Sequence, residues 1–305
     1  MAAIYISFFD KYKIEADKRP VFLFSVFVAV TATTAFFLNG DVTNNYGAFA
    51  FAGTSISFID YARNMLLPSL GASTLVFFAY ILTFRKELRI AFPKEEPQKK
   101  VKMSKEGIKA LGVMFLVIVL WVLEPLHGVS SARIAVIGAA LMFLFRLTGL
   151  KDIKNLNYGL LWFLTAMFAI GRTLIGSGVA EKMRDAISPL LPASGSFWFL
   201  PAIILIIMFL HMIMGSIATS LSVSIPMVII LAEGFLSNEF VAMLVLSSVV
   251  FHYVLPFHHG IIMVGFGSGY FDNRHTLKFG PLLTLVVLIS VLFFYVPWWN
   301  YIGIN

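Results

Sequence analysis

The chain has 305 residues, of which 59% are hydrophobic and 13% are charged, and its mean hydropathy is +0.88. This composition excludes an ordinary soluble domain and indicates an integral membrane protein built of helices. The net charge of +7 does not indicate nucleic-acid binding, because the Lys and Arg lie in short segments between apolar runs, and the absence of cysteine excludes disulfides and thiol catalysis.

The first apolar run is interrupted by a polar cluster. Residues 20–38 form most of a membrane span, but NGDVTNNYG at 39–47 stops the run before AFAFAG resumes it. Backbone groups freed by such a break are tolerable in a bilayer only where they are buried in protein or line a cavity. Interrupted helices form the substrate and ion sites of secondary transporters. The candidate substrate- or ion-binding residues of this cluster are Gly40, Asp41, Thr43 and Asn44.

The longest polar stretch follows an apolar span over 68–84. RKELRIAFPKEEPQKKVKMSKEG at 85–107 is rich in Lys and holds two prolines. Because Lys and Arg concentrate on the cytoplasmic side of membrane proteins, we predict a cytoplasmic linker here. We expect residues 1–84 to be the end of a first repeat and residues 108–305 to be a second repeat.

Two short apolar arms flank a hydroxyl-rich tip in the second half. The arm at 197–214 meets GSIATSLS at 215–222, after which VSIPMVIILAEG is apolar again. This pattern predicts a re-entrant hairpin, although two ordinary spans would give a similar pattern. The tip hydroxyls that we expect to bind substrate or a coupling ion are those of Ser216, Thr219 and Ser220.

A second interrupted span follows over residues 240–270. A proline removes a backbone donor in the middle of this apolar run, and two adjacent histidines and a glycine come directly after it. Imidazole titrates near neutral pH, so these histidines are able to carry protons or to bind an anion. The candidate residues of this break are Pro256, His258, His259 and Gly260.

Each of the three clusters also has a purely structural interpretation. Asp41 is an acid inside an apolar span, which is functional by default, but a loop aspartate that caps the next helix would look the same. The small hydroxyl residues of the hairpin would also allow helices to pack closely. The histidines would equally serve to bond neighbouring helices at a proline kink.

The two interrupted spans are followed by similar sequences. FIDYARNMLLPSL (58–70) and FDNRHTLKFGPLL (271–283) share Phe, Asp, Arg and Pro in the same order, and a final span follows each. With the basic segments on the cytoplasmic side, the two broken spans run in opposite directions and the C-terminus lies outside. Inverted repeats of this kind are typical of secondary transporters.

Together these segments resemble the ion transporter superfamily, which includes the divalent anion/sodium symporters and the arsenite efflux permeases. GDVTNN is similar to the family's Gly-Asp/Thr-Pro-Pro-Asn segment, GSIATSLS to its Ser-Asn-Thr hairpin tip, and LPFHHGIIMVGFGSG to its segment with Leu-Pro, Thr-Pro-Pro-Asn and Gly-x-Gly. The resemblance implies an all-α polytopic membrane fold with inverted repeats, interrupted helices and a re-entrant hairpin. It also implies a transporter that dimerises in the cytoplasmic membrane.

Two departures from the family pattern change the expectation. Ile217 and Ala218 stand where the family has the Asn and Thr of its hairpin, which puts sodium coupling in doubt and favours protons. The family also has several helices and a first Ser-Asn-Thr hairpin upstream of the segment matched here. We therefore expect a fragment, a half-carrier completed by a partner chain, or a degenerate relative.

The predicted function is secondary active transport of a small anion (dicarboxylate, citrate, sulfate or arsenite-like), with Na⁺ or H⁺ as coupling ion and no other cofactor. A Na⁺/H⁺ antiporter of the same superfamily and a non-transporting or incomplete membrane subunit are the alternatives. We expect no enzyme, because the HExxH and GxSxG motifs are absent. The expected partners are the anion, the lipid bilayer, and a second copy or a partner chain that supplies missing helices, with no metal site and no nucleic acid.

Overall fold

The computed structural model describes residues 14–89, 103–154, 176–193 and 196–304, together with Phe9 and single residues between 162 and 173. Every regular element in these ranges is helical, which confirms the predicted fold class. The elements before the polar stretch are α2 (Arg19–Thr33), η1 (Leu38–Asp41), α3 (Val42–Phe51) and α4 (Phe58–Thr83). Most of the predicted linker, residues 90–102, lies outside the described residues.

The remaining helices form a central group and a C-terminal group. The central elements are α5 (Lys105–Val122), α6 (Glu124–His127), α7 (Ser131–Leu144) and α8 (Leu150–Ile153). The C-terminal elements are α10 (Val179–Ile187), η2 (Ser188–Leu190), α11 (Phe199–Met214), α12 (Ile217–Leu231), α13 (Asn238–Val249), η3 (Pro256–His258), α14 (Gly260–Gly267), α15 (Asn273–Ser290), η4 (Val291–Tyr295) and α16 (Val296–Tyr301).

Two helices of the described chain are long and apolar enough to cross a bilayer by length and composition. They are α4, with 26 residues, and the continuous helix Asn273–Tyr301, with 29 residues, which α15, η4 and α16 form together. The shorter apolar helices α2, α7, α11, α12 and α13 have 10 to 17 residues. Such lengths are expected where spans are interrupted or fold back as a hairpin.

The two long helices pack side by side and antiparallel. At one end, Lys278 Nζ lies 2.6 Å from Oε1 of Glu87, just beyond the end of α4. At the other end, Trp299 donates through Nε1 to the carbonyl oxygen of Asn64, at 3.0 Å. The start of the predicted linker and the C-terminal end of the last helix therefore lie at opposite ends of this pair. Which end faces the cytoplasm stays a prediction.

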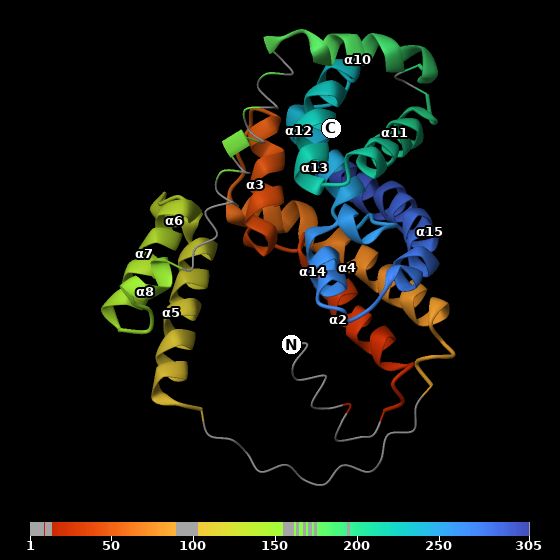
Figure 1. Cartoon of the computed structure of the whole chain (residues 1–305). Helices are drawn as coiled ribbons and strands as arrows, with labels where there is room; N and C mark the ends of the chain where they lie inside the picture. The colour runs from red at the N-terminus through yellow and green to blue at the C-terminus, as the bar shows by residue number, and fades with distance from the viewer. Residues whose placement is uncertain are drawn as a thin grey trace.

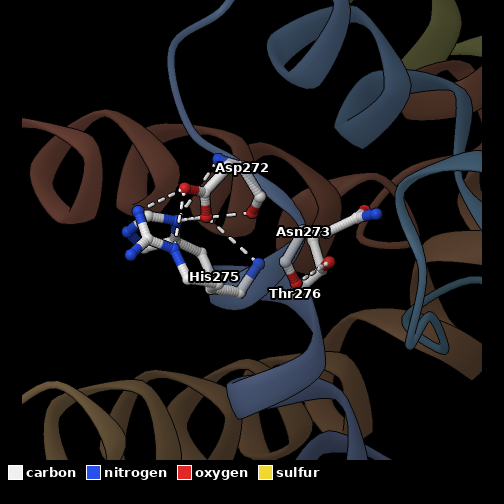
Figure 2. Close-up of polar contacts among 5 residues, drawn as sticks. Asp272, Asn273, His275 and Thr276 are labelled. Carbon is white, nitrogen blue, oxygen red and sulfur yellow. Dashed lines mark hydrogen bonds and ion pairs between the residues drawn. The ribbon is translucent and has the colours of Figure 1, made fainter.

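Both long helices begin at a side-chain cap. Ser57 Oγ accepts the backbone N–H of Asp60 at 3.1 Å at the start of α4. Asp272 Oδ1 accepts the backbone N–H of Arg274 at 3.1 Å at the start of α15 (Figure 2). The Arg274 guanidinium also donates to Asp272 Oδ2 at 2.6 Å, and this bond holds the pKa of Asp272 below its usual range. Each of the two similar sequence segments thus starts a long helix that follows a break.

The two interrupted helices pack against each other arm by arm. α2 lies against α14, and α3 lies against α13 (Figure 1). The Phe27 ring of α2 is 5.6 Å from the ring of Phe271, just beyond α14. Asn238 at the start of α13 donates to the carbonyl oxygen of Ala52, at the end of α3, at 3.1 Å. Because the first arm of each helix pairs with the second arm of the other, the two breaks lie at the same level of the bundle.

The predicted hairpin is formed by α11 and α12, which pack against each other. Gly215 joins them with a φ of 65°, in the left-handed region that favours glycine. α12 packs on both α3 and α13, and α11 contacts η3, so the hairpin lies beside the interrupted helices.

The central helices α5 to α7 form a unit beside the start of α4 (Figure 1). The Trp121 ring stacks on the Phe58 ring at 5.8 Å between centroids. Glu124 Oε2 accepts the Ser131 hydroxyl at 2.6 Å. The boundaries predicted for the repeats at 1–84 and 108–305 remain predictions.

Candidate functional site

The hairpin tip is in contact with the second break. A Cβ atom added at Gly215 would lie 3.0 Å from the ring of Phe257. α12, which starts at the tip, also packs along α3, which starts at the first break. Three helices, α3, α12 and α14, therefore begin at the breaks and the tip, and all the residues predicted to bind substrate or ions lie at these three places.

The first break is held by an asparagine that the sequence analysis did not single out. Asn45 is fully buried, and its Nδ2 donates to the carbonyl oxygens of Thr34 and Phe37, both at 3.0 Å. The Thr34 carbonyl loses its helical partner where α2 ends, so the amide satisfies a backbone group that the break leaves unpaired. The Phe37 carbonyl already accepts the backbone N–H of Gly40 at 2.8 Å, and Asn45 is its second donor. In the sequence, Asn45 is visible only as a second asparagine directly after Asn44. A helix that starts at residue 42 places residue 45 on its buried side.

Position 40 requires a glycine, because the backbone passes very close to itself there. A Cβ atom at this position would lie 2.5 Å from the carbonyl oxygen of Thr34, closer than any side chain tolerates. Gly40 therefore shapes the break sterically, and its predicted role in binding stays a prediction.

Asp41 is the N-cap of α3. Its Oδ1 accepts the backbone N–H of Asn44 at 3.2 Å, and its Oδ2 accepts Asn44 Nδ2 at 2.7 Å. Because this cap allows the helix to begin at once, Thr43 and Asn44 lie in the first turn of α3 and not in the break where the sequence placed them. The buried Oδ1 of Asn44 has no protein partner among the described residues. It is an acceptor that a ligand could use.

The three predicted hydroxyls of the hairpin lie at the start of α12. Ser216 is the N-cap, and its Oγ accepts the backbone N–H of Thr219 at 3.4 Å. Thr219 is half-buried, whereas Ser220 is fully buried. Ser216 and Thr219 are therefore the hydroxyls that lie nearer to the surface of the tip.

The second break is held by the two predicted histidines. His258 Nδ1 accepts the backbone N–H groups of Val254 and Leu255, each at 3.2 Å. His259 Nδ1 accepts the backbone N–H of Ile261, also at 3.2 Å, and so caps α14. An Nδ1 that accepts a hydrogen bond carries no proton, so both imidazoles are in the neutral form with hydrogen on Nε2.

The second break is longer than the sequence suggested. α13 ends at Val249, although apolar helix-compatible sequence continues towards Pro256. The backbone bonds of the histidines hold the intervening residues out of the helix, and the residue before a proline disfavours helical geometry. Pro256 is buried at the start of η3, whereas Gly260 is exposed with open space around it.

Two further histidines, which the sequence analysis did not include among the site residues, lie beside this break. His211 of α11 has its ring centroid 5.5 Å from that of His252 and 5.9 Å from that of His258. All three rings are buried. Their spacing in the chain gave no signal, because they come from three different elements. Among the described residues no group of three or more His, Asp or Glu side chains could hold a metal ion.

Comparison with known proteins places the chain in a family. The model of the sodium:sulfate symporter transmembrane region matches residues 15–305. Over 268 residues, which are 84% of this chain and 48% of the relative, it is 20% identical to an Arabidopsis thaliana protein named dicarboxylate transporter 1, chloroplastic. Over 229 residues, 72% of this chain and 43% of the relative, it is 20% identical to a Cupriavidus necator protein named membrane protein.

The chain thus spans about half the length of these curated relatives. The match to the family model, in contrast, extends over nearly all of this chain and includes both helix breaks and the hairpin. The chain belongs to the family of the sodium:sulfate symporter transmembrane region, within the ion transporter superfamily, and is a multi-pass membrane protein.

Proposed function

We propose that the protein acts in secondary active transport of a small anion, of the dicarboxylate, citrate or sulfate type, across the cytoplasmic membrane. The observation that carries this proposal is the convergence of helix starts at the two breaks and the hairpin tip. The N-terminus of a helix carries partial positive charge and free backbone N–H groups, which favour an anion. The relative named as a dicarboxylate transporter supports the same substrate class.

The two breaks are expected to differ in the charge that they attract. Asp41 already occupies the start of α3, so its carboxylate offsets the partial positive charge of that helix. The start of α12 is capped by the neutral Ser216, and the start of α14 by the neutral His259. We therefore place the anion at the tip and the second break, with the hydroxyls of Ser216 and Thr219 as donors.

The coupling ion that we propose is the proton. Ile217 and Ala218 occupy the first turn of α12, and both are buried apolar side chains. They offer no oxygen atom where the family pattern has an Asn and a Thr. The imidazoles at the second break and beside it supply ionisable groups instead.

Two alternatives to anion transport are tested in the same experiment. One is a Na⁺/H⁺ antiporter of the same superfamily, and the other is a non-transporting membrane subunit that acts with a partner chain or a second copy. In either case we propose that it performs no covalent chemistry, in keeping with the family to which it belongs.

The experiment is uptake of labelled succinate, citrate and sulfate into proteoliposomes that contain the full chain, with sodium and pH gradients imposed separately. We expect uptake under an inward proton gradient alone. Thr219→Val should raise the KM for the anion by about tenfold, the effect of one lost hydrogen bond to a charged group. Thr74→Val, at an exposed position on α4, is the matched control and should leave the KM unchanged.

Each other outcome points to a different alternative. Uptake driven by sodium alone would reject proton coupling and leave the anion carrier in place. Exchange of Na⁺ for H⁺ without any anion would identify an antiporter. If no gradient drives any flux, the subunit is the better description.

A further inference from the structure

His211 lies at the centre of the contact between the hairpin and the second break. It is in the last turn of α11 and is completely buried. Its Nδ1 is 2.9 Å from Oγ of Ser220, on the second arm of the hairpin. Its Nε2 is 3.0 Å from the carbonyl oxygen of His252, at the second break. One imidazole therefore joins both arms of the hairpin to the break.

The partners of His211 differ from those of the other buried histidines. His258 and His259 accept backbone N–H groups at Nδ1, so a proton added there would break those bonds. His252 bonds Thr284 through Nε2, while its Nδ1 is buried without a partner among the described residues. Both nitrogens of His211 instead face oxygen atoms that can accept a hydrogen bond. Of these four imidazoles, His211 is the one for which the structure gives an oxygen acceptor within hydrogen-bond distance of both ring nitrogens.

The hydroxyl of Ser220 can follow a change of charge on His211. It lies within hydrogen-bond distance of Nδ1 and also of the carbonyl oxygen of Ser216, at 2.7 Å. A hydroxyl has one hydrogen, so it donates to neutral Nδ1 or to the carbonyl, but not to both. When Nδ1 carries a proton, Nδ1–H donates to Ser220 Oγ and the hydroxyl donates to Ser216. The charged state thus has a complete chain of hydrogen bonds that ends at the hairpin tip.

A buried imidazolium needs a counter-charge. The titratable groups that face His211 from the packed elements are the other imidazoles, those of His252 and His258 with His259 next to them. Among the described residues no carboxylate pairs with it, and burial of an unpaired charge is strongly unfavourable. The missing negative charge would be supplied by an anion at the start of α12 and α14.

We propose that His211 takes up a proton from water at Nδ1 when an anion binds at the hairpin tip, and returns it to water when the anion leaves. This inference rests on the proposed function and names the residue that couples the two ions. The positive charge of the imidazolium stabilises the bound anion, and the negative charge of the anion stabilises the buried imidazolium. By linkage, each ligand raises the affinity for the other by the same factor.

The test measures protons and anions separately on the purified full chain in detergent. Succinate, citrate or sulfate is added to weakly buffered protein at pH 7, binding is measured by calorimetry, and proton uptake is measured with an indicator dye. We expect the wild-type protein to take up about one proton for each anion bound, and anion affinity to fall about tenfold for each pH unit above neutrality. His211→Gln keeps an amide near the position of Nε2 but cannot be charged. It should bind the anion with no proton uptake and with an affinity independent of pH.

Two further variants sharpen this test. His127→Gln removes an exposed histidine at the end of α6 and should behave as the wild type. Ser220→Ala keeps the imidazole but removes the acceptor for Nδ1–H, so the pH midpoint of proton uptake should fall by about one unit. This variant also serves if His211→Gln does not fold.

The inference and the proposed function fail in distinguishable ways. Anion binding by the wild type without proton uptake, or unchanged proton uptake in His211→Gln, would overturn the role of His211 and leave the anion site intact. A wild type that binds none of the three anions would overturn the proposed function, and this inference with it.

Discussion

At the first break a buried amide, Asn45, donates to the carbonyl oxygens of Thr34 and Phe37, whereas at the second break two imidazoles accept backbone N–H groups. At both breaks, side chains form hydrogen bonds with backbone groups that have no helical partner, as burial in a membrane protein requires. The amide that holds the first break cannot take up a proton near neutral pH, whereas an imidazole can. We therefore expect the first break to be a fixed element and the second break to respond to protons.

The largest expected effect tests the fixed break. Asn45→Ala removes the donor from the buried carbonyl of Thr34 and one of the two donors from the carbonyl of Phe37, and should lower the free energy of unfolding by about 3 kcal/mol. Thermal unfolding in detergent measures this change. Asn300→Ala, at an exposed position of α16, is the matched control and should stay within about 0.5 kcal/mol of the wild type. Equal stability of the two variants would show that Asn45 does not hold the break.

The second prediction separates the two breaks by pH. His258→Ala leaves the N–H groups of Val254 and Leu255 without their acceptor and should cost about 2 kcal/mol at pH 7.5. Protonation of Nδ1 removes the same lone pair, and the unfolded chain takes up that proton below about pH 6.5, so the wild type should lose stability as the pH falls. His258→Ala should lose part of this pH dependence, and Asn45→Ala should keep all of it. The same pH dependence in all three proteins would remove the distinction between the breaks.

The third prediction concerns the turn that holds the hairpin against the second break. Gly215→Ala should cost about 1 kcal/mol for the left-handed backbone, and the Phe257 ring must also shift. Gly303→Ala, with a φ of 81° and open space around it, has the backbone cost alone. Anion uptake should therefore fall in Gly215→Ala and remain normal in Gly303→Ala. Normal uptake in both variants would mean that the tip and the break act independently.

The smallest expected effect lies away from both breaks. Lys278→Met removes the exposed ion pair with Glu87 and should change the free energy of unfolding by less than about 0.5 kcal/mol. The pKa of Glu87, which the bond to Lys278 holds below its usual range, should rise. Unfolding at low and high salt and a titration of Glu87 measure the two effects. A loss as large as that of Asn45→Ala would show that this ion pair, and not the breaks, sets the stability of the bundle.

The breaks and the hairpin are visible in the sequence, but not all the residues that hold them are. Gly40, Asp41, Pro256 and the two adjacent histidines were visible because helix-breaking or ionisable residues are rare in apolar runs. Asn45 and His211 were not singled out, because nothing in the local pattern shows which polar side chain will face a freed carbonyl. Their partners are Thr34 and Phe37 for Asn45, and Ser220 and the His252 carbonyl for His211.

The sequence by itself determined the helical membrane class, the order of interrupted helix, hairpin and second interrupted helix, and the similarity of the segments after the two breaks. These features depend on composition and on local helix breaking, which act within a few residues. The tertiary structure alone decided that α2 pairs with α14 and α3 with α13, and that His211 reaches both Ser220 and the second break. Which polar groups meet depends on packing between elements far apart in the chain, and packing assigns each buried polar group its partner.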